Sequence, residues 1–297
     1  MVESRFFLHS RHPLPQSTSS LRYWLAHHPL VADYHWDHNV WGSSWLFLIL
    51  SVLGYVLAVQ VVKLSLLWRR RPVPLGPIPA LYNLVLLLAS LLMFVGCWQS
   101  AAVEIEETRW LWQRSKTSFE WILCFPLGTR PAGRVFFWSY MFYLSKLYEF
   151  FGTFILIFQK QNPSVGHVFR NSMVVIMCFL WLQFSQSLQI LTLLSSTGLY
   201  IIMYVYFFLC RVGLAPRLDN AVRYCQIAQY VVMSFASVAL VGLHFKKQGC
   251  SGMGAWLFGA VLDMSSLPFI LIVDKQRRQR DFCNNDESST NNSTKQE

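Results

Sequence analysis

The chain of 297 residues is 54% hydrophobic and only 13% charged, so its charged share is about half that of an average soluble domain. Its mean hydropathy of +0.36 comes from long apolar blocks that must bury their surface in lipid or against other helices. This composition excludes an ordinary soluble enzyme and predicts an all-α polytopic membrane protein. The net charge of +10 lies mainly in short basic runs beside the apolar blocks, which is typical of membrane topology and not of a nucleic-acid surface.

Seven apolar blocks are long enough to span a membrane, because a helix needs about 20 apolar residues to cross the hydrocarbon layer. The expected spans are about 41–68, 78–103, 135–158, 167–186, 188–210, 221–244 and 255–273. They form a seven-helix membrane domain over 41–274. An N-terminal segment, 1–40, precedes it and shows no evident removable signal peptide, and a tail, 275–297, follows it. The tail is basic and then rich in Asn, Ser and Thr, so we expect disorder there.

Basic residues predict the orientation of these spans. Arginines follow the first block at 69–71 and the fifth block at 211, 217 and 223, and four basic residues follow the last block at 275–280. By the positive-inside rule these loops are cytosolic, the N-terminus is lumenal or external and the C-terminus is cytosolic. Five basic residues between the second and third blocks oppose this orientation, although four glutamates share that loop.

The seven cysteines contain no CxxC pair, so their spacing indicates neither a zinc site nor a disulfide-rich scaffold. Cys124 and Cys250 fall in loops assigned to the lumenal side, where disulfides form, and we predict that they bridge. Cys283 is expected to be a free cytosolic thiol. Four others are expected to pack within helices: Cys97, Cys178, Cys210 and Cys225.

The N-terminal segment carries His35 and His38 at the spacing of a metal-binding pair, with Asp37 between them. A lumenal surface loop explains these residues better, and we expect no metal site.

Polar side chains inside the apolar blocks call for a partner or a water-filled cavity, because a charge at mid-bilayer costs about 2.5 to 3.5 kcal/mol. Lys146 and Glu149 lie three apart on one face of the third block and can form an ion pair. The alternative interpretation is a purely structural pair that orients the helix in the bundle. Polar residues also open and close the fourth block and mark the sixth: His167, Arg170, Asn171, Gln183, Ser185, Gln186, Gln226 and Gln229. Together they predict a polar chamber enclosed by the third to sixth blocks. The aromatic stripe of Met203, Tyr204, Tyr206, Phe207 and Phe208, taken alone, favours plain packing.

The order of these motifs resembles the ELO family of fatty-acid elongation condensing enzymes, particularly its plant branch, over about residues 21–273. The family pattern KxxExxDT appears as KLYEFFGT at 146–153, and HxxHH appears as HVFRN at 167–171. The pattern NxxxHxxMYxYY appears as STGLYIIMYVYF at 196–207, and TxxQxxQF appears as RYCQIAQY at 223–230. Four motifs in this order and spacing make the resemblance specific.

The resemblance implies a seven-helix protein of the endoplasmic reticulum membrane with a lumenal N-terminus. Such proteins condense malonyl-CoA with a long-chain acyl-CoA to a 3-oxoacyl-CoA, releasing CoA and carbon dioxide, in very-long-chain fatty acid synthesis. The implied partners are acyl-CoA, malonyl-CoA, membrane lipid and the other enzymes of the elongation cycle, with homo- or hetero-oligomerisation left open. No cofactor, metal or nucleic acid is expected.

The resemblance also assigns candidate site residues. His167 is the catalytic candidate, and the substrate-binding candidates are Lys146, Glu149, Thr153, Arg170, Asn171, Tyr200, Met203, Tyr204, Gln226 and Gln229. In the family the acyl group is thought to pass to an imidazole of the HxxHH box, helped by a histidine of the fifth span.

This chain departs from the family pattern at the nucleophile itself. Arg170 and Asn171 replace two box histidines, Tyr200 replaces the histidine of the fifth span, and Gly152 replaces an aspartate. At neutral pH the Arg170 guanidinium, the Asn171 amide and the protonated Tyr200 phenol are all poor nucleophiles.

Three functions remain open on the sequence alone. The first is a condensing enzyme that uses His167 as nucleophile or base, with Arg170 holding a phosphate or carboxylate. The second is a non-catalytic relative that binds acyl-CoA or regulates active elongases, which the lost histidines favour. A seven-helix receptor shares the topology but not the motif order.

Overall fold

The computed structural model describes residues 22–68, 74–111, 122–160, 163–212, 219–246, 249–262 and 264. Within these ranges the chain is all-helical, apart from one isolated bridge between His35 and Ala132, and six helices are long and apolar enough to span a membrane. The elements are η1 (Tyr23–His27), α2 (Pro29–Ala32), α3 (Trp45–Leu67), α4 (Ile78–Leu111), α6 (Arg134–Phe158), α7 (Val165–Phe184), α8 (Gln189–Val212) and α9 (Asp219–Lys246). The protein is therefore a multi-pass membrane protein.

Six of the seven expected spans are present as long helices, with shifted ends. The first begins at Trp45 instead of Trp41, because Gly42 has a positive φ of 83° and the Ser44 side chain caps the helix by accepting the Phe47 N–H at 3.1 Å. The second continues to Leu111. Of the seventh span, a helix over Met253–Leu262 and Met264 are described. The remainder of that span lies outside the described residues, as do Arg69, the tail and Cys283.

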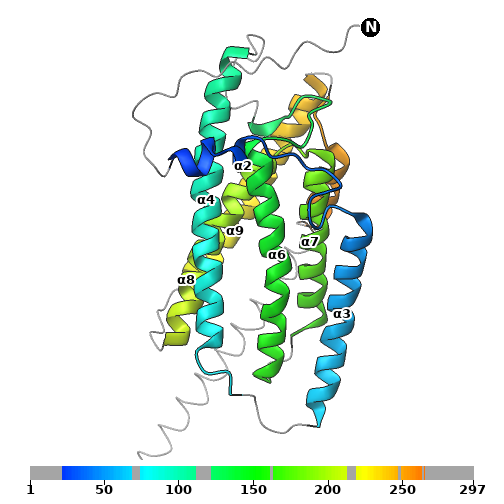
Figure 1. Cartoon of the computed structure of the whole chain (residues 1–297), viewed down its shortest axis with the longest axis vertical. Coiled ribbons are helices and arrows are strands. Elements are labelled where there is room, and N and C mark those ends of the chain that lie inside the picture. The colour runs from blue at the N-terminus through cyan, green and yellow to red at the C-terminus, as the bar shows by residue number, and fades with distance from the viewer. Residues whose placement is uncertain are drawn as a thin grey trace, which may run out of the picture.

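The helices form a bundle in which neighbours in sequence run in opposite directions (Figure 1). α4 packs against α8 and α6, α6 packs against α7, and α9 packs against α8, while α3 lies at the edge against α6 and α7. We call the end where α3, α6 and α8 begin the disulfide end, and the opposite end, where α4, α7 and α9 begin, the His167 end. The outer face of α3 is exposed and aliphatic, as a lipid-facing helix requires: Leu46, Leu50, Leu53, Leu57 and Leu64.

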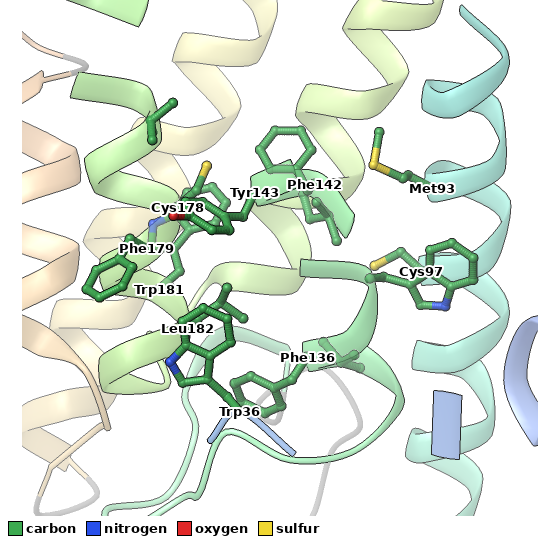
Figure 2. Packing of buried hydrophobic residues seen from close by; sticks show 14 of the residues in the cluster. Trp36, Met93, Cys97, Phe136, Phe142, Tyr143, Cys178, Phe179, Trp181 and Leu182 are labelled. Atoms are coloured by element: carbon green, nitrogen blue, oxygen red, sulfur yellow. The ribbon is translucent and has the colours of Figure 1, made fainter. Parts of the chain in front are cut away.

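The core consists largely of aromatic side chains between α6 and α7. Figure 2 shows Tyr143, Phe179 and Trp181 together, with Met93 and Cys97 on α4 across the bundle. Cys97 and Cys178 are buried free thiols within helices, which confirms the packing predicted for them.

Three connections are joined at the disulfide end. Cys124 and Cys250 form a disulfide with a Cα–Cα distance of 5.3 Å, which confirms the predicted bridge. Beside it, the Ser187 hydroxyl donates to the Ser251 carbonyl at 2.8 Å and accepts the Phe125 N–H at 3.1 Å. The loop before α6, the α7–α8 turn and the loop after α9 are thus held together.

The N-terminal segment lies across the same end and is pinned to the helices by hydrogen bonds. Arg134 Nε donates to the Ala26 carbonyl at 2.8 Å, and Trp36 Nε1 donates to Gln183 Oε1 at 3.2 Å. His35 Nδ1 lies 2.7 Å from the Asp33 carbonyl, and the described residues contain no cluster of three metal-ligating side chains.

The close approach of α4 and α6 depends on Gly96. A Cβ at this position would lie 2.1 Å from the Trp138 ring, and that ring is held by hydrogen bonds from Nε1 to Ser100 Oγ at 3.0 Å and to the Leu25 carbonyl at 3.2 Å. Gly96→Ala should therefore destabilise the protein by about 1–3 kcal/mol through overpacking, measured by thermal unfolding in detergent.

Gly54→Ala in α3 is the matched control, because nothing lies within 4 Å of its Cβ position. Alanine is the better helix former, so this variant should be neutral or stabilising by up to about 1 kcal/mol. Equal melting temperatures for the two variants would contradict the packing argument.

Candidate functional site

A pocket of about 960 Å³ lies inside the bundle between α4, α6, α7, α8 and α9. All eleven candidates carried over by resemblance line it: Lys146, Glu149, Thr153, His167, Arg170, Asn171, Tyr200, Met203, Tyr204, Gln226 and Gln229. The lining is mixed, because apolar and aromatic side chains such as Met177, Phe142 and Trp181 continue the pocket toward the disulfide end. The pocket thus joins a polar region near the His167 end to an apolar extension.

Lys146 and Glu149 form the predicted ion pair at the centre of the polar region. The Lys146 side chain is 2% exposed, and its Nζ contacts Glu149 Oε1, which also accepts the Tyr204 hydroxyl at 2.8 Å. The Lys146 ammonium lies 3.6 Å from the centroid of the Tyr200 ring, a cation–π distance. Tyr200, at the position of a family histidine, thus shields a buried cation.

His167 lies in the first turn of α7, which begins because Ser164 accepts the His167 N–H at 3.1 Å as a helix N-cap. Its Nε2 lies 3.3 Å from both Thr153 Oγ1 on α6 and the Asn171 amide one turn further along α7. Thr153 in turn lies 2.8 Å from the Tyr55 hydroxyl of α3. Three helices therefore fix the imidazole.

Two contacts connect α9 to the facing helices. Arg170 donates to the Tyr230 hydroxyl at 3.4 Å, and Gln229 donates to Ser196 Oγ at 3.0 Å. Arg170 is exposed, so its guanidinium remains available to an anionic group entering the pocket.

Gly152 leaves room that Tyr82 uses. A Cβ at residue 152 would meet the Tyr82 hydroxyl at 2.6 Å, and that hydroxyl donates to the Glu149 carbonyl at 3.4 Å. In this chain a tyrosine from α4 therefore occupies the space that an aspartate at this position would need.

Two expectations about the site are corrected. Gln183, Ser185 and Gln186 do not line the pocket, because they lie at the disulfide end, where Gln183 bonds Trp36 and Ser185 ends α7 in a left-handed conformation. The packing interpretation of the aromatic stripe is wrong for four of its residues, since they line the pocket: Met203, Tyr204, Tyr206 and Phe207.

Sequence reasoning missed Tyr55 and Tyr82. The Tyr55 hydroxyl lies in a largely apolar stretch of helix, and Tyr82 stands beside Asn83 in another, which is the available signal, but neither belongs to a motif. Their contacts with Thr153 and Glu149 depend on which helices pack together.

Comparison with known proteins agrees with this architecture. The pattern of the ELO (GNS1/SUR4) family matches residues 40–272. The chain is 39% identical over 260 residues to the fatty acid elongase 3-like protein of Arabidopsis thaliana, covering 85% of this chain and 90% of that protein. It is 27% identical over 248 residues to fatty acid elongase A of Dictyostelium discoideum, covering 81% and 85% of the two chains. The chain belongs to the ELO (GNS1/SUR4) family.

Proposed function

We propose that this protein condenses malonyl-CoA with a long-chain acyl-CoA to a 3-oxoacyl-CoA in very-long-chain fatty acid synthesis. The observation that carries the proposal is the placement of His167 in a pocket whose polar region continues into an apolar extension. A fatty acyl thioester has the same two-part chemistry, a polar reacting head and an aliphatic chain. The elongase names of the relatives support this choice of substrate.

His167 is the group proposed to react. An imidazole nitrogen attacks the acyl carbon, the C–S bond breaks, and CoA leaves as a thiolate that takes up a proton. Malonyl-CoA then loses carbon dioxide, and the resulting enolate attacks the acyl carbon, so that the C–N bond breaks and the imidazole is regenerated. The sum is acyl-CoA, malonyl-CoA and one proton giving 3-oxoacyl-CoA, CoA and carbon dioxide, with no cofactor required.

The position of the remaining groups suits this chemistry. Arg170 at the His167 end can hold a phosphate or carboxylate by charge-assisted hydrogen bonds. Lys146 and Glu149 carry opposite charges, so the pair adds no net charge to the part of the pocket that lies beyond Arg170.

We place the protein in the endoplasmic reticulum membrane with its N-terminus lumenal, where it would work beside the other elongation-cycle enzymes. The disulfide supports this orientation, because it lies at the end opposite Lys160 and Arg170, and the lumen permits disulfides.

A second candidate function is a non-catalytic relative that binds acyl-CoA and regulates active elongases. It is favoured by Arg170, Asn171 and Tyr200, which line the pocket where the family has histidines. Under this candidate, the triple change Arg170→His, Asn171→His and Tyr200→His should create turnover that the natural chain lacks.

The test is expression in yeast lacking its own elongases, with microsomes supplied with labelled malonyl-CoA and acyl-CoA. The natural chain should yield two-carbon-extended product, and His167→Ala should lower it by about 100-fold or more. His38→Ala is the matched control, because His38 is exposed and lies outside the pocket.

Unchanged product in His167→Ala would remove His167 from the mechanism. Absence of product from the natural chain in this strain, together with co-purification of an active elongase from cells that contain one, would support the second candidate instead.

A further inference from the structure

The lipid-facing surface of α3 is bounded by tryptophan. At the disulfide end its exposed aliphatic stripe continues to the exposed side chains of Trp45 and Trp41, and at the His167 end the Trp68 side chain is exposed as well. The helix rises by about 34 Å from Trp45 to Trp68, slightly more than the hydrocarbon layer of a bilayer. Tryptophan is enriched at both surfaces of that layer, because its ring is apolar and its N–H is polar.

The outer face of α4 has the same pattern. One exposed stripe follows helical spacing along it: Leu81, Leu88, Leu91 and Trp98. From Ile78, where α4 begins, to Trp98 the helix rises by about 30 Å. Further along, the helix carries charge, since Glu104 forms an ion pair with Arg134 at 3.2 Å. The change from lipid to water on α4 therefore falls between Trp98 and Glu104.

The N-terminal segment meets α4 at this boundary. η1 packs against α4 (Figure 1), and the Ser100 hydroxyl donates to the Leu25 carbonyl at 3.2 Å. The side chain of the neighbouring Trp24 is 59% exposed and stacks on the His28 ring with centroids 4.7 Å apart. Because Ser100 is only two residues beyond Trp98, the exposed Trp24 lies within about a helical turn of the depth of Trp98.

The exposed side chains of the segment change character along its length. From 33 to 39 all of them are polar: Asp33, His35, Asp37, His38 and Asn39. Those before and after this stretch are apolar or aromatic: Trp24, Pro29, Leu30 and Trp41. Trp36, by contrast, is only 8% exposed and packs on Phe179 with ring centroids 6.0 Å apart. The middle of the segment thus suits contact with water, and its two ends suit contact with lipid.

We propose that residues 24–41 lie in the interfacial layer of the membrane at the disulfide end, with Trp24 and Trp41 inserted among phospholipid headgroups and residues 33–39 facing water. Phospholipid fits this surface better than a protein partner does, because Trp24 and Trp41 continue the lipid-facing stripes of α4 and α3. Lipid then anchors the segment in addition to its hydrogen bonds with α6, and it helps to hold Trp36 over the aromatic core. The inference does not depend on the proposed function.

Quenching of tryptophan fluorescence by lipid tests this placement in the full chain, reconstituted in phosphatidylcholine nanodiscs. Bromine on an acyl chain quenches indoles near it, and one preparation carries bromine close to the glycerol while another carries it near the chain ends. Because the chain has 12 tryptophans, the signal of Trp24 or Trp41 is the difference between the natural protein and Trp24→Phe or Trp41→Phe. Both side chains are exposed, so phenylalanine should preserve the fold, which thermal unfolding checks.

We expect the Trp24 and Trp41 signals to be quenched at least about two-fold more by bromine close to the glycerol than by bromine near the chain ends. Trp98→Phe supplies the reference signal on α4 and should show the same preference. Trp36→Phe is the matched control, because the buried indole of the same segment should respond much less to either lipid.

Quenching of Trp24 and Trp41 by aqueous iodide and by neither brominated lipid would place the segment in water and overturn the inference. Stronger quenching from bromine near the chain ends would place it within the hydrocarbon layer. Quenching by neither lipid nor iodide would mean that protein covers these side chains. Each of these results overturns the inference, which stands only if both tryptophans show the expected preference.

Discussion

Glu149→Leu is expected to lower the free energy of unfolding by about 3–5 kcal/mol, because it leaves the Lys146 ammonium buried without its counter-charge. The Lys146 side chain is only 2% exposed, and the Tyr204 hydroxyl would lose its acceptor at the same time. The Tyr200 ring cannot replace a carboxylate, since a cation–π contact supplies only about 0.5–2 kcal/mol. Thermal and denaturant unfolding in detergent would measure the loss.

The double variant Lys146→Met/Glu149→Leu should recover most of that stability, because it removes both charges and fills the site with apolar side chains of similar size. Lys146→Met alone should be less harmful than Glu149→Leu, since the Glu149 side chain is 20% exposed and keeps its bond from Tyr204. Additive effects of the two single changes would contradict the coupling.

The sequence predicted the features that depend on neighbouring residues in one helix. The Lys146–Glu149 pair follows from three-residue spacing on α6, and six spans follow from apolar length. The predicted start of the first span is too early because Trp41 is apolar, whereas the positive φ of Gly42 and the side-chain cap of Ser44 delay the helix to Trp45.

Features that depend on helix packing could not be predicted in this way. Gln183 lies only two residues beyond Trp181, which lines the pocket, but it bonds Trp36 instead, and that contact depends on where the N-terminal segment packs. Conversely, Tyr55 and Thr153 are 98 residues apart and meet only because α3 packs against α6. The disulfide was predictable, because the assignment of Cys124 and Cys250 to the same side of the membrane depends on span count and not on side-chain contacts.

Under the proposed condensation reaction, Trp181→Ala is expected to lengthen the acyl product by at least one two-carbon cycle. Trp181 lines the pocket on α7 about 21 Å beyond His167 and stacks on Phe142 with ring centroids 6.1 Å apart. Beyond it the fully buried Leu182, Leu188 and Leu193 fill the disulfide end. Removing the indole therefore extends the apolar part of the pocket, and product chain lengths from microsomes would show the shift.

The same change should also lower the free energy of unfolding by about 3–5 kcal/mol, so a control must separate length from stability. Leu182→Ala provides it, because Leu182 is fully buried beside Trp181 in sequence but does not line the pocket. We expect Leu182→Ala to reduce stability by about 2–5 kcal/mol and leave product length unchanged. Trp181→Phe should give an intermediate shift, since a smaller ring still blocks part of the extension. A lengthened product in Leu182→Ala would mean that general loosening of the disulfide end, and not the Trp181 ring, limits the chain.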